Sequence, residues 1–265
     1  MSEALVLYDA RPPAVILTLN RADKRNALSR GLIAALTEAF ERARDDAAAR
    51  CVILTGAGPV FCAGMDLAEL AEAVERSNQP HSKPDSVWDD ALRLATLYDL
   101  IYGLPKPTIA AVNGAAVAGG AGLVTACDLA LAVPEARFGY PEVRRGLVAA
   151  MVMPHLLRHV GERTARYLLL TGDLIDAAEA CRTGLINAVV PPAQLLERAY
   201  EWAHSLAEGG PKALAATKVL LKQFSRQAVS LEEAARASAA PRLTEECQQG
   251  LRAFFAKEQV PWAPP

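Results

Sequence analysis

The feature that most constrains the fold is an alternation of short apolar runs with helical patterns through the first half of the chain. Four short runs are β-branched or apolar, which predicts buried strands: AVILTLN (14–20), CVILTG (51–56), PTIAAVNG (107–114) and LALAVP (129–134). Turn residues and then a helical pattern follow the first three. Strands that alternate with helices in this way predict an α/β core.

Each expected helix begins at a recognisable signal. Ser29 is placed to cap a helix running roughly from Arg30 to Ala43, and Asp66 to cap a helix in DLAELAEAVER (66–76). The segment GGAGLVTA (119–126) opens a third helix. Between the last two, residues 76–90 are polar and punctuated by proline, which predicts a long irregular loop.

The chain changes character after position 190. From Pro191 onward it is rich in alanine and helical in pattern, with no strand signal. We therefore expect an α/β core over residues 1–190 and a helical C-terminal subdomain over residues 191–265. The apolar faces of such helices can pack on their own core or on a neighbouring subunit.

Composition bounds the class of partner and the compartment. The 265 residues carry a net charge of −2, which argues against nucleic-acid binding through bulk electrostatics. No apolar run approaches the roughly 20 residues of a membrane span, and the N-terminus has no basic segment typical of a signal peptide. The five cysteines are odd in number and form no C-x-x-C pair, which predicts reduced thiols and a cytoplasmic location.

Three glycines, Gly119, Gly120 and Gly122, lie within four positions after the third expected strand. Dinucleotide binding requires G-x-G-x-x-G, and a Walker loop requires Lys-Ser/Thr after the last glycine; neither pattern is present. Two interpretations remain: a tight strand-to-helix turn, or an oxyanion hole. In an oxyanion hole, glycine lets a backbone N–H approach a ligand oxygen at the positive end of a helix.

A second turn of the same kind favours the oxyanion hole. In FCAGMDLAEL (61–70), Gly64 precedes an expected helix, and the N–H of Met65 would be exposed there. Two such turns at strand ends can direct two N–H donors at one oxygen. That arrangement suits an enzyme that forms an enolate or transfers an acyl group.

Longer motifs carry a resemblance to a known family. NRADKRNALS, GAGPVFCAGMDL, KPTIAAVNGAAVAGGAGLVTACDLALA, ARFGYPEVRRGL and LTGDLIDAAEACRTGLINAVVP resemble, in order and spacing, the crotonase (enoyl-CoA hydratase/isomerase) superfamily. The resemblance implies a crotonase-like spiral of ββα units and a helical C-terminal region that builds trimers or dimers of trimers. It also implies an acyl-coenzyme A thioester as substrate. Since coenzyme A is part of the substrate, no separate cofactor and no metal are expected.

The resemblance assigns roles by position. Met65 and Gly119 would donate the two oxyanion-hole N–H groups, and Glu142, after the FG-x-P turn, would be the acid/base group. Other residues would contact coenzyme A: Lys24 and Arg25 near the phosphates, the backbone of Ala63 near the adenine, Asp66 beside it, and Phe254 and Lys257 closing over the nucleotide.

One expected acid is missing. Family members that hydrate a 2-enoyl thioester typically use a second glutamate three residues after the second oxyanion glycine, and here that position is Gly122. A single Glu142 suits a double-bond isomerase that moves a proton from C2 to C4, yet single-glutamate hydratases also occur in the family. A decarboxylase, a hydrolase or a thioester binder without turnover are further alternatives. Glu142 can also be read as a surface glutamate paired with Arg144 or Arg145.

Several other polar residues are expected to have no catalytic role. Asp85, Asp89 and Asp90 are interpreted as solvated charges, Tyr140 as a packed tyrosine, and Cys62 as a small buried residue rather than a nucleophile. His155 and His159 are expected on a helix surface, without a third metal ligand. The acyl pocket is expected between the loop 76–90 and GLVAAMVMPHLL (146–157).

Overall fold

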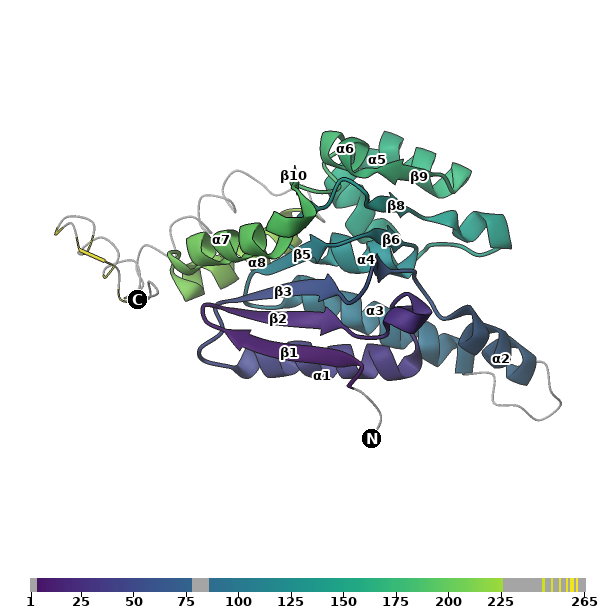
Figure 1. The fold of residues 1–265 in the computed structure, drawn as a ribbon, viewed down its shortest axis with the longest axis horizontal. Coiled ribbons are helices and arrows are strands. Elements are labelled where there is room, and N and C mark those ends of the chain that lie inside the picture. The colour runs from purple at the N-terminus through teal and green to yellow at the C-terminus, as the bar shows by residue number, and fades with distance from the viewer. Residues whose placement is uncertain are drawn as a thin grey trace.

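A computed structural model describes residues 4–77, residues 86–225 and single positions between 245 and 261. Its larger sheet has six strands in the order β1-β2-β3-β5-β7-β10 (Figure 1). The bounds are β1 (Val6–Arg11), β2 (Ala14–Leu19), β3 (Cys51–Gly56), β5 (Thr108–Val112), β7 (Leu129–Ala132) and β10 (Ala188–Val189). β1 is antiparallel to β2, and the other pairings are parallel. The four strands expected from the sequence are confirmed.

A second sheet of short strands was not anticipated. It contains β4 (Val60–Cys62), β6 (Ala115–Val117), β8 (Arg137–Gly139) and β9 (Leu174–Asp176), in that order. β4, β6 and β8 are mutually parallel, and each directly follows a strand of the larger sheet and precedes a helical segment. The chain therefore repeats a long strand, a short strand and a helix, which confirms the spiral of ββα units.

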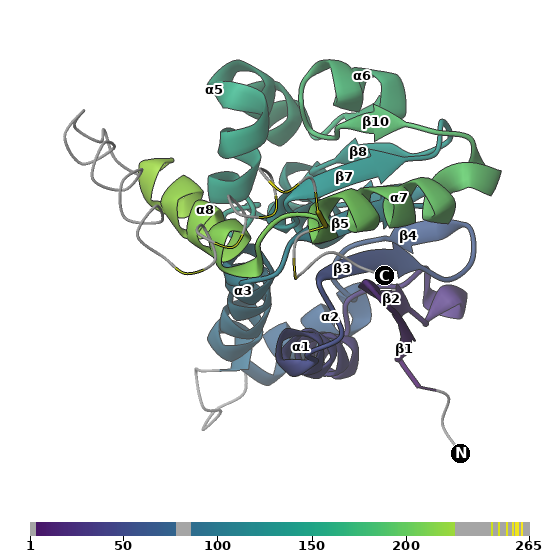
Figure 2. The ribbon, with the colours of Figure 1, turned by 90° about the vertical axis from the view of Figure 1, so that its left-hand side faces the viewer.

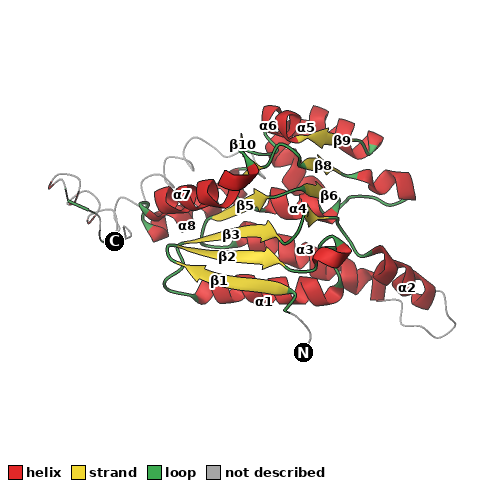
Figure 3. Ribbon diagram, in the orientation of Figure 1, coloured by secondary structure: helices red, strands yellow, loops and turns green. Residues whose placement is uncertain are grey.

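Figure 3 shows the helices, and α1, α2 and α4 begin where the sequence signals indicate. The Ser29 hydroxyl accepts a hydrogen bond from the Leu32 N–H at 3.2 Å and caps α1. The bounds are α1 (Arg30–Asp45), α2 (Leu67–Ser77), α3 (Ser86–Gly103), α4 (Gly119–Ala126), α5 (Met153–Thr171), α6 (Ala177–Arg182), α7 (Leu195–Ala207) and α8 (Pro211–Phe224). Single 3-10 turns are η1 (Ala22–Lys24), η2 (Pro141–Arg145) and η3 (Pro192–Gln194).

The expectation of a loop over residues 76–90 is wrong at both ends. α2 continues to Ser77, and α3 begins at Ser86. Apolar side chains of α3 explain the second difference, because Leu94, Leu97, Tyr98 and Ile101 recur at helical spacing and are buried. Residues 78–85, Asp85 among them, lie outside the described part of the chain.

Helices cover both faces of the larger sheet. Figure 2 shows α7 on one side of it and α1 and α3 on the other. All five residues of β5 are buried, as expected for a central strand covered on two faces. α7 packs on β3 and β5, and the division into a core and a C-terminal subdomain at residue 190 stays a prediction. None of the described helices combines the length and the apolar character needed to cross a lipid bilayer.

One polar cluster ties α8 to the core beside β7. Asp128, which directly precedes β7, accepts hydrogen bonds from the N–H and hydroxyl of Thr108 at 2.7 and 2.9 Å. Its carboxylate also pairs with the Lys218 ammonium of α8 at 2.6 Å, and the Lys218 side chain is only 10% exposed. A carboxylate with three donors in a mostly buried place is costly to remove, because its partners then lose their acceptor.

We expect Asp128→Ala to lower the free energy of unfolding by about 2–3 kcal/mol, since the Lys218 ammonium loses its anionic partner and keeps the Lys106 carbonyl, while the buried Thr108 amide loses its acceptor. The control is Glu162→Ala, which breaks the exposed Arg166–Glu162 pair on α5. This variant should change the free energy of unfolding by less than about 0.5 kcal/mol. Urea unfolding measures both. Equal effects of the two variants would mean that Asp128 does not anchor α8.

Candidate active site

Three candidate functional groups lie just beyond the carboxyl ends of three neighbouring parallel strands. Met65 follows β4, Gly119 follows β6, and Glu142 follows β8. Because β6 pairs with both β4 and β8 in parallel, all three strand ends meet at one edge of the small sheet. The sequence placed the two glycine turns after the long strands, so the structure corrects this detail: the short strands intervene and bring the groups together.

The backbone N–H of Met65 is directed away from its neighbouring strand. Leu28 donates its N–H to the Gly64 carbonyl at 2.7 Å and accepts from the Asp66 N–H at 3.1 Å. In a parallel bridge these bonds go to the two neighbours of the paired residue, so the N–H of Met65 itself points to the other side. It is therefore available to a ligand.

The N–H of Gly119 is available for a different reason. Gly119 is the first residue of α4, and the first N–H groups of a helix have no partner within it. The preceding residue, Ala118, has φ 52° and ψ −121°, a conformation that costs a side-chain-bearing residue about 1–3 kcal/mol. The Ala118 N–H is held on the Gly139 carbonyl at 2.8 Å. Backbone strain of this kind is often found where a ligand is bound.

The two turns approach each other through bare backbone. A Cβ added to Gly64, which has φ +92°, would lie 2.8 Å from the Val117 carbonyl oxygen and 3.3 Å from the Gly119 nitrogen. A Cβ on Gly120 would lie 2.2 Å from the Cys62 carbonyl oxygen. Only glycine permits these contacts, and they place the Met65 and Gly119 turns side by side.

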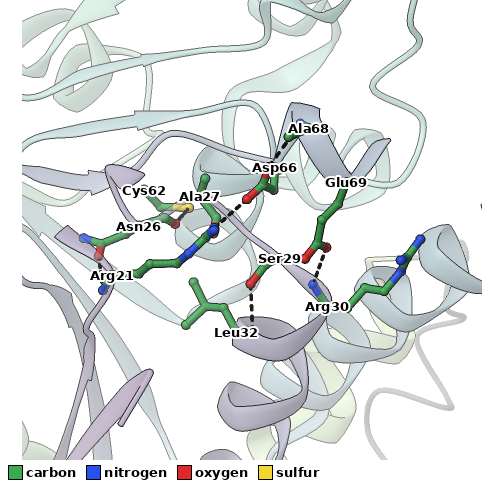
Figure 4. A network of polar contacts seen from close by, with 10 residues as sticks. All are labelled: Arg21, Asn26, Ala27, Ser29, Arg30, Leu32, Cys62, Asp66, Ala68 and Glu69. Carbon is green, nitrogen blue, oxygen red and sulfur yellow. Dashed lines mark hydrogen bonds and ion pairs between the residues drawn. The ribbon is translucent and has the colours of Figure 1, made fainter. Parts of the chain in front are cut away.

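A polar network joins the Met65 turn to the segment before α1 (Figure 4). Arg21 binds Asp66 through a 2.6 Å ion pair, and the Asp66 carboxylate also accepts the Ala68 N–H at the start of α2. The buried Asn26 amide donates to the carbonyls of Ala57, Val60 and Phe61, at 2.8 to 3.1 Å. These bonds hold the end of β4 and the Met65 turn in one position.

The groups surround a cavity of about 640 Å³. Its wall includes the Met65 and Gly119 turns, Glu142, Tyr98 and the segment that follows η2. From that segment Leu147, Val148, Ala149, Met151 and Val152 contribute, which confirms the expected pocket wall in residues 146–157. The other expected wall, the loop 76–90, contributes no lining residue within the described part of the chain. The volume and mostly apolar lining suit an acyl chain.

Glu142 is partly buried in this wall. Burial raises the pKa of its carboxyl above the ordinary value, while its own backbone N–H and the Arg145 guanidinium act in the opposite direction. Its Oε2 atom is buried and has no hydrogen-bond partner among the described residues. The alternative of a Glu142–Arg144 ion pair is wrong, because Arg144 pairs with Asp173. A carboxyl with a raised pKa in a residue that lines a cavity is suited to proton transfer.

The expected coenzyme A residues are brought together in part. Lys24, Arg25, Ala63 and Asp66 all line the cavity, and both basic side chains are exposed at its edge. The Asp66 carboxylate is committed to Arg21, whose hydrogen bond lowers the Asp66 pKa. Phe254 and Lys257 lie outside the described residues. Contact of any of these residues with coenzyme A stays a prediction.

Other sequence expectations have mixed outcomes. Tyr140 and Cys62 are buried, as predicted. Asp90 is not a free loop charge, since it binds Arg30 and Arg93. The surface position expected for His155 is wrong: its ring is buried beside Tyr98 and Tyr102.

His159 contacts the Thr125 carbonyl oxygen through Nε2 at 3.0 Å, which ties α5 to α4. A search of the described side chains finds no group of three histidine, cysteine or acidic residues placed to hold a metal ion.

Comparison with known proteins decides the family. The family described as enoyl-CoA hydratase/isomerase matches residues 13–264. The chain belongs to the enoyl-CoA hydratase/isomerase family. A candidate enoyl-CoA hydratase of Thermus thermophilus is 43% identical, over 91% of this chain and 94% of its own. The 2,3-dehydroadipyl-CoA hydratase of Escherichia coli is 34% identical over 97% of each. The structure of an enoyl-CoA hydratase from Shewanella pealeana has a TM-score of 0.90 at 29% identity, covering 97% of this chain and 96% of its own.

Within this enoyl-CoA hydratase/isomerase, the structure explains why position 122 carries no acid. A Cβ on Gly122 would lie 2.5 Å from the Tyr98 hydroxyl oxygen, 2.6 Å from the Tyr98 ring and 2.6 Å from Val152 Cγ1. The space into which a glutamate at this position would extend is filled. Glu142 is thus opposed by a phenol rather than by a second carboxyl.

We expect Gly122→Ala to lower the free energy of unfolding by about 1–3 kcal/mol, because the added methyl group overlaps Tyr98 and Val152. Gly103→Ala at the end of α3 is the matched control, since its Cβ would meet nothing closer than the flexible Lys222 ammonium at 3.5 Å. Thermal and urea unfolding of both variants measure the difference. If the two variants were equally stable, the claim that Tyr98 and Val152 fill the space next to Gly122 would be wrong.

Sequence reasoning missed three side chains of the site. Arg21 and Asn26 occur in a quoted motif but received no role, and Tyr98 was not considered. Their partners, such as Asp66, Phe61 and Gly119, are 21 to 45 residues away in the chain. No local pattern reports such contacts; the one available signal was the apolar helical spacing around Tyr98, which argued against a loop.

Proposed function

We propose that this member of the family acts on an enoyl-CoA thioester with Glu142 as its single acid/base group. The Met65 and Gly119 N–H groups hold the thioester oxygen, and the enolate charge that develops there is stabilised by two donors in a cavity with a mostly apolar lining. The observation that carries the proposal is the convergence of these three groups at the ends of β4, β6 and β8.

Glu142 can serve two reactions through the same enolate. In hydration, its carboxylate takes a proton from water while the water oxygen bonds to C3, and the C2–C3 electron pair moves toward the thioester oxygen. Glu142 then returns its proton to C2. In isomerisation, Glu142 takes a proton from C2 of a 3-enoyl thioester and returns it at C4. Isomerisation is the second candidate, because position 122 carries no second carboxyl and this reaction needs only one.

The coenzyme A moiety is proposed to lie along the edge marked by Lys24, Arg25 and Ala63, with Asp66 supporting the turn. Exposed lysine and arginine side chains at a cavity edge suit the phosphates. Phe254 and Lys257 remain candidates for closing over the nucleotide.

An assembly of three or six copies is also proposed, and the exposed Val219 and Leu221 of α8 support it. The proposed cytoplasmic location is supported by the buried Cys51, Cys62 and Cys127, which are unpaired thiols.

Incubation with crotonyl-CoA in oxygen-18 water, followed by mass spectrometry, tests the reaction. We expect labelled 3-hydroxybutyryl-CoA from the wild type and a rate reduced by 10²-fold or more for Glu142→Gln, because the amide cannot accept and return a proton. A parallel incubation with 3-butenoyl-CoA tests isomerisation. No product from either thioester would support a binder without turnover, and equal rates for both proteins would remove Glu142 from the mechanism.

Glu142→Gln should also change stability in a pH-dependent way. Burial raises the folded-state pKa of Glu142, so the folded protein favours the protonated carboxyl and loses stability as pH rises through that pKa. The glutamine variant has no such loss. Its melting temperature should therefore exceed that of the wild type more at pH 7 than at pH 4. If the difference in melting temperature between the variant and the wild type does not change with pH, the pKa of Glu142 is the same in the folded and the unfolded protein.

A further inference from the structure

Tyr98 connects the middle of α3 to the oxyanion turn. Its side chain lines the cavity but is almost fully buried, with 1% of the residue exposed. The phenol O–H donates a 2.8 Å hydrogen bond to the carbonyl oxygen of Gly119, 21 residues further along the chain. A buried hydroxyl thus holds the residue whose N–H is proposed to bind the thioester oxygen.

The turn that Tyr98 holds is strained and has no side-chain cap. Ala118 occupies the N-cap position of α4 with φ 52°. Its methyl side chain has no hydrogen-bond acceptor and cannot cap the helix. Gly119 and Gly120, which follow, have the largest conformational freedom of any residue type. A turn of this composition keeps a single conformation only when its surroundings impose it. Tyr98 supplies such a constraint from another helix.

The Tyr98 ring acts on the same region sterically. Its Oη and Cζ atoms lie 2.5 and 2.6 Å from where a Cβ of Gly122 would be, so the phenol covers the first turn of α4. Tyr98 therefore contacts α4 at both Gly119 and Gly122. Burial raises the pKa of the Tyr98 phenol well above its ordinary value, which keeps the O–H on the Gly119 carbonyl at any working pH.

We propose that Tyr98 is a positioning residue of the oxyanion hole: its hydroxyl holds the Gly119–Gly120 peptide through the Gly119 carbonyl, and so restrains the Gly119 backbone such that the preceding N–H of Gly119 faces the thioester oxygen. This inference rests on the proposed function, because it assigns a support to one of the two oxyanion donors. It adds a side-chain group, on α3, to a site otherwise built from backbone and Glu142.

The test compares Tyr98→Phe, which keeps the ring and removes the hydroxyl, with Tyr102→Phe one turn later on α3. Tyr102 contacts His155 and Arg158 and does not line the cavity. We expect Tyr98→Phe to reduce kcat about tenfold with KM changed less than twofold, because a misplaced donor weakens transition-state binding most. Tyr102→Phe should leave both constants unchanged.

A spectroscopic readout separates positioning from loss of structure. The absorption band of 2,4-hexadienoyl-CoA moves to longer wavelength when hydrogen bonds polarise its carbonyl, and the slow turnover expected of Glu142→Gln allows the spectrum of the bound thioester to be recorded. Adding Tyr98→Phe should reduce that shift, and adding Tyr102→Phe should not. An undiminished shift, or an unchanged kcat for Tyr98→Phe, would overturn the inference. Turnover by Glu142→Gln at the wild-type rate would instead overturn the proposed function, whatever the shift shows.

Discussion

The direct contact of two backbone turns is the constraint on which the rest of the site depends. A Cβ at Gly120 would lie 2.2 Å from the Cys62 carbonyl oxygen, and one at Gly64 would lie 2.8 Å from the Val117 carbonyl oxygen. Because no side chain separates the turns, their N–H groups can address one ligand oxygen. The short parallel strands β4 and β6 set this approach, and β8 adds Glu142 beside it.

Keeping the site in this form costs stability that other contacts offset. Ala118 has an unfavourable backbone conformation, and Glu142 loses hydration without gaining a partner for Oε2 among the described residues. Against these costs stand the Arg21–Asp66 pair, the buried Asn26 amide with three carbonyl partners, and the Tyr98 hydroxyl on Gly119. Each lies one step away from the reacting groups. In the proposed function, few atoms take part in the chemistry, and the surrounding residues hold them in place.

Much of the fold and part of the site could be predicted because they depend on local interactions. The four long strands follow from continuous apolar runs, and the Ser29 cap follows from a hydroxyl three residues before an N–H that lacks a partner. The glycine turns are recognisable because close backbone approach restricts the residue type, and Glu142 is assigned by its place in a motif that resembles the family. What could not be predicted is the second sheet, whose three-residue strands have too little pattern to be distinguished from loops.

By itself, the sequence indicated the candidate residues of the site, since the close approach of two backbone turns requires glycine and proton transfer requires a carboxyl. Only the tertiary structure decided how they are supported and what excludes a second acid. Tyr98, from a helix whose beginning was interpreted as a loop, fills the space above Gly122, and His155 is buried beside it rather than on a surface. Arg21 reaches Asp66 across 45 residues. Contacts between distant segments depend on how the whole chain packs, and no local sequence pattern records them.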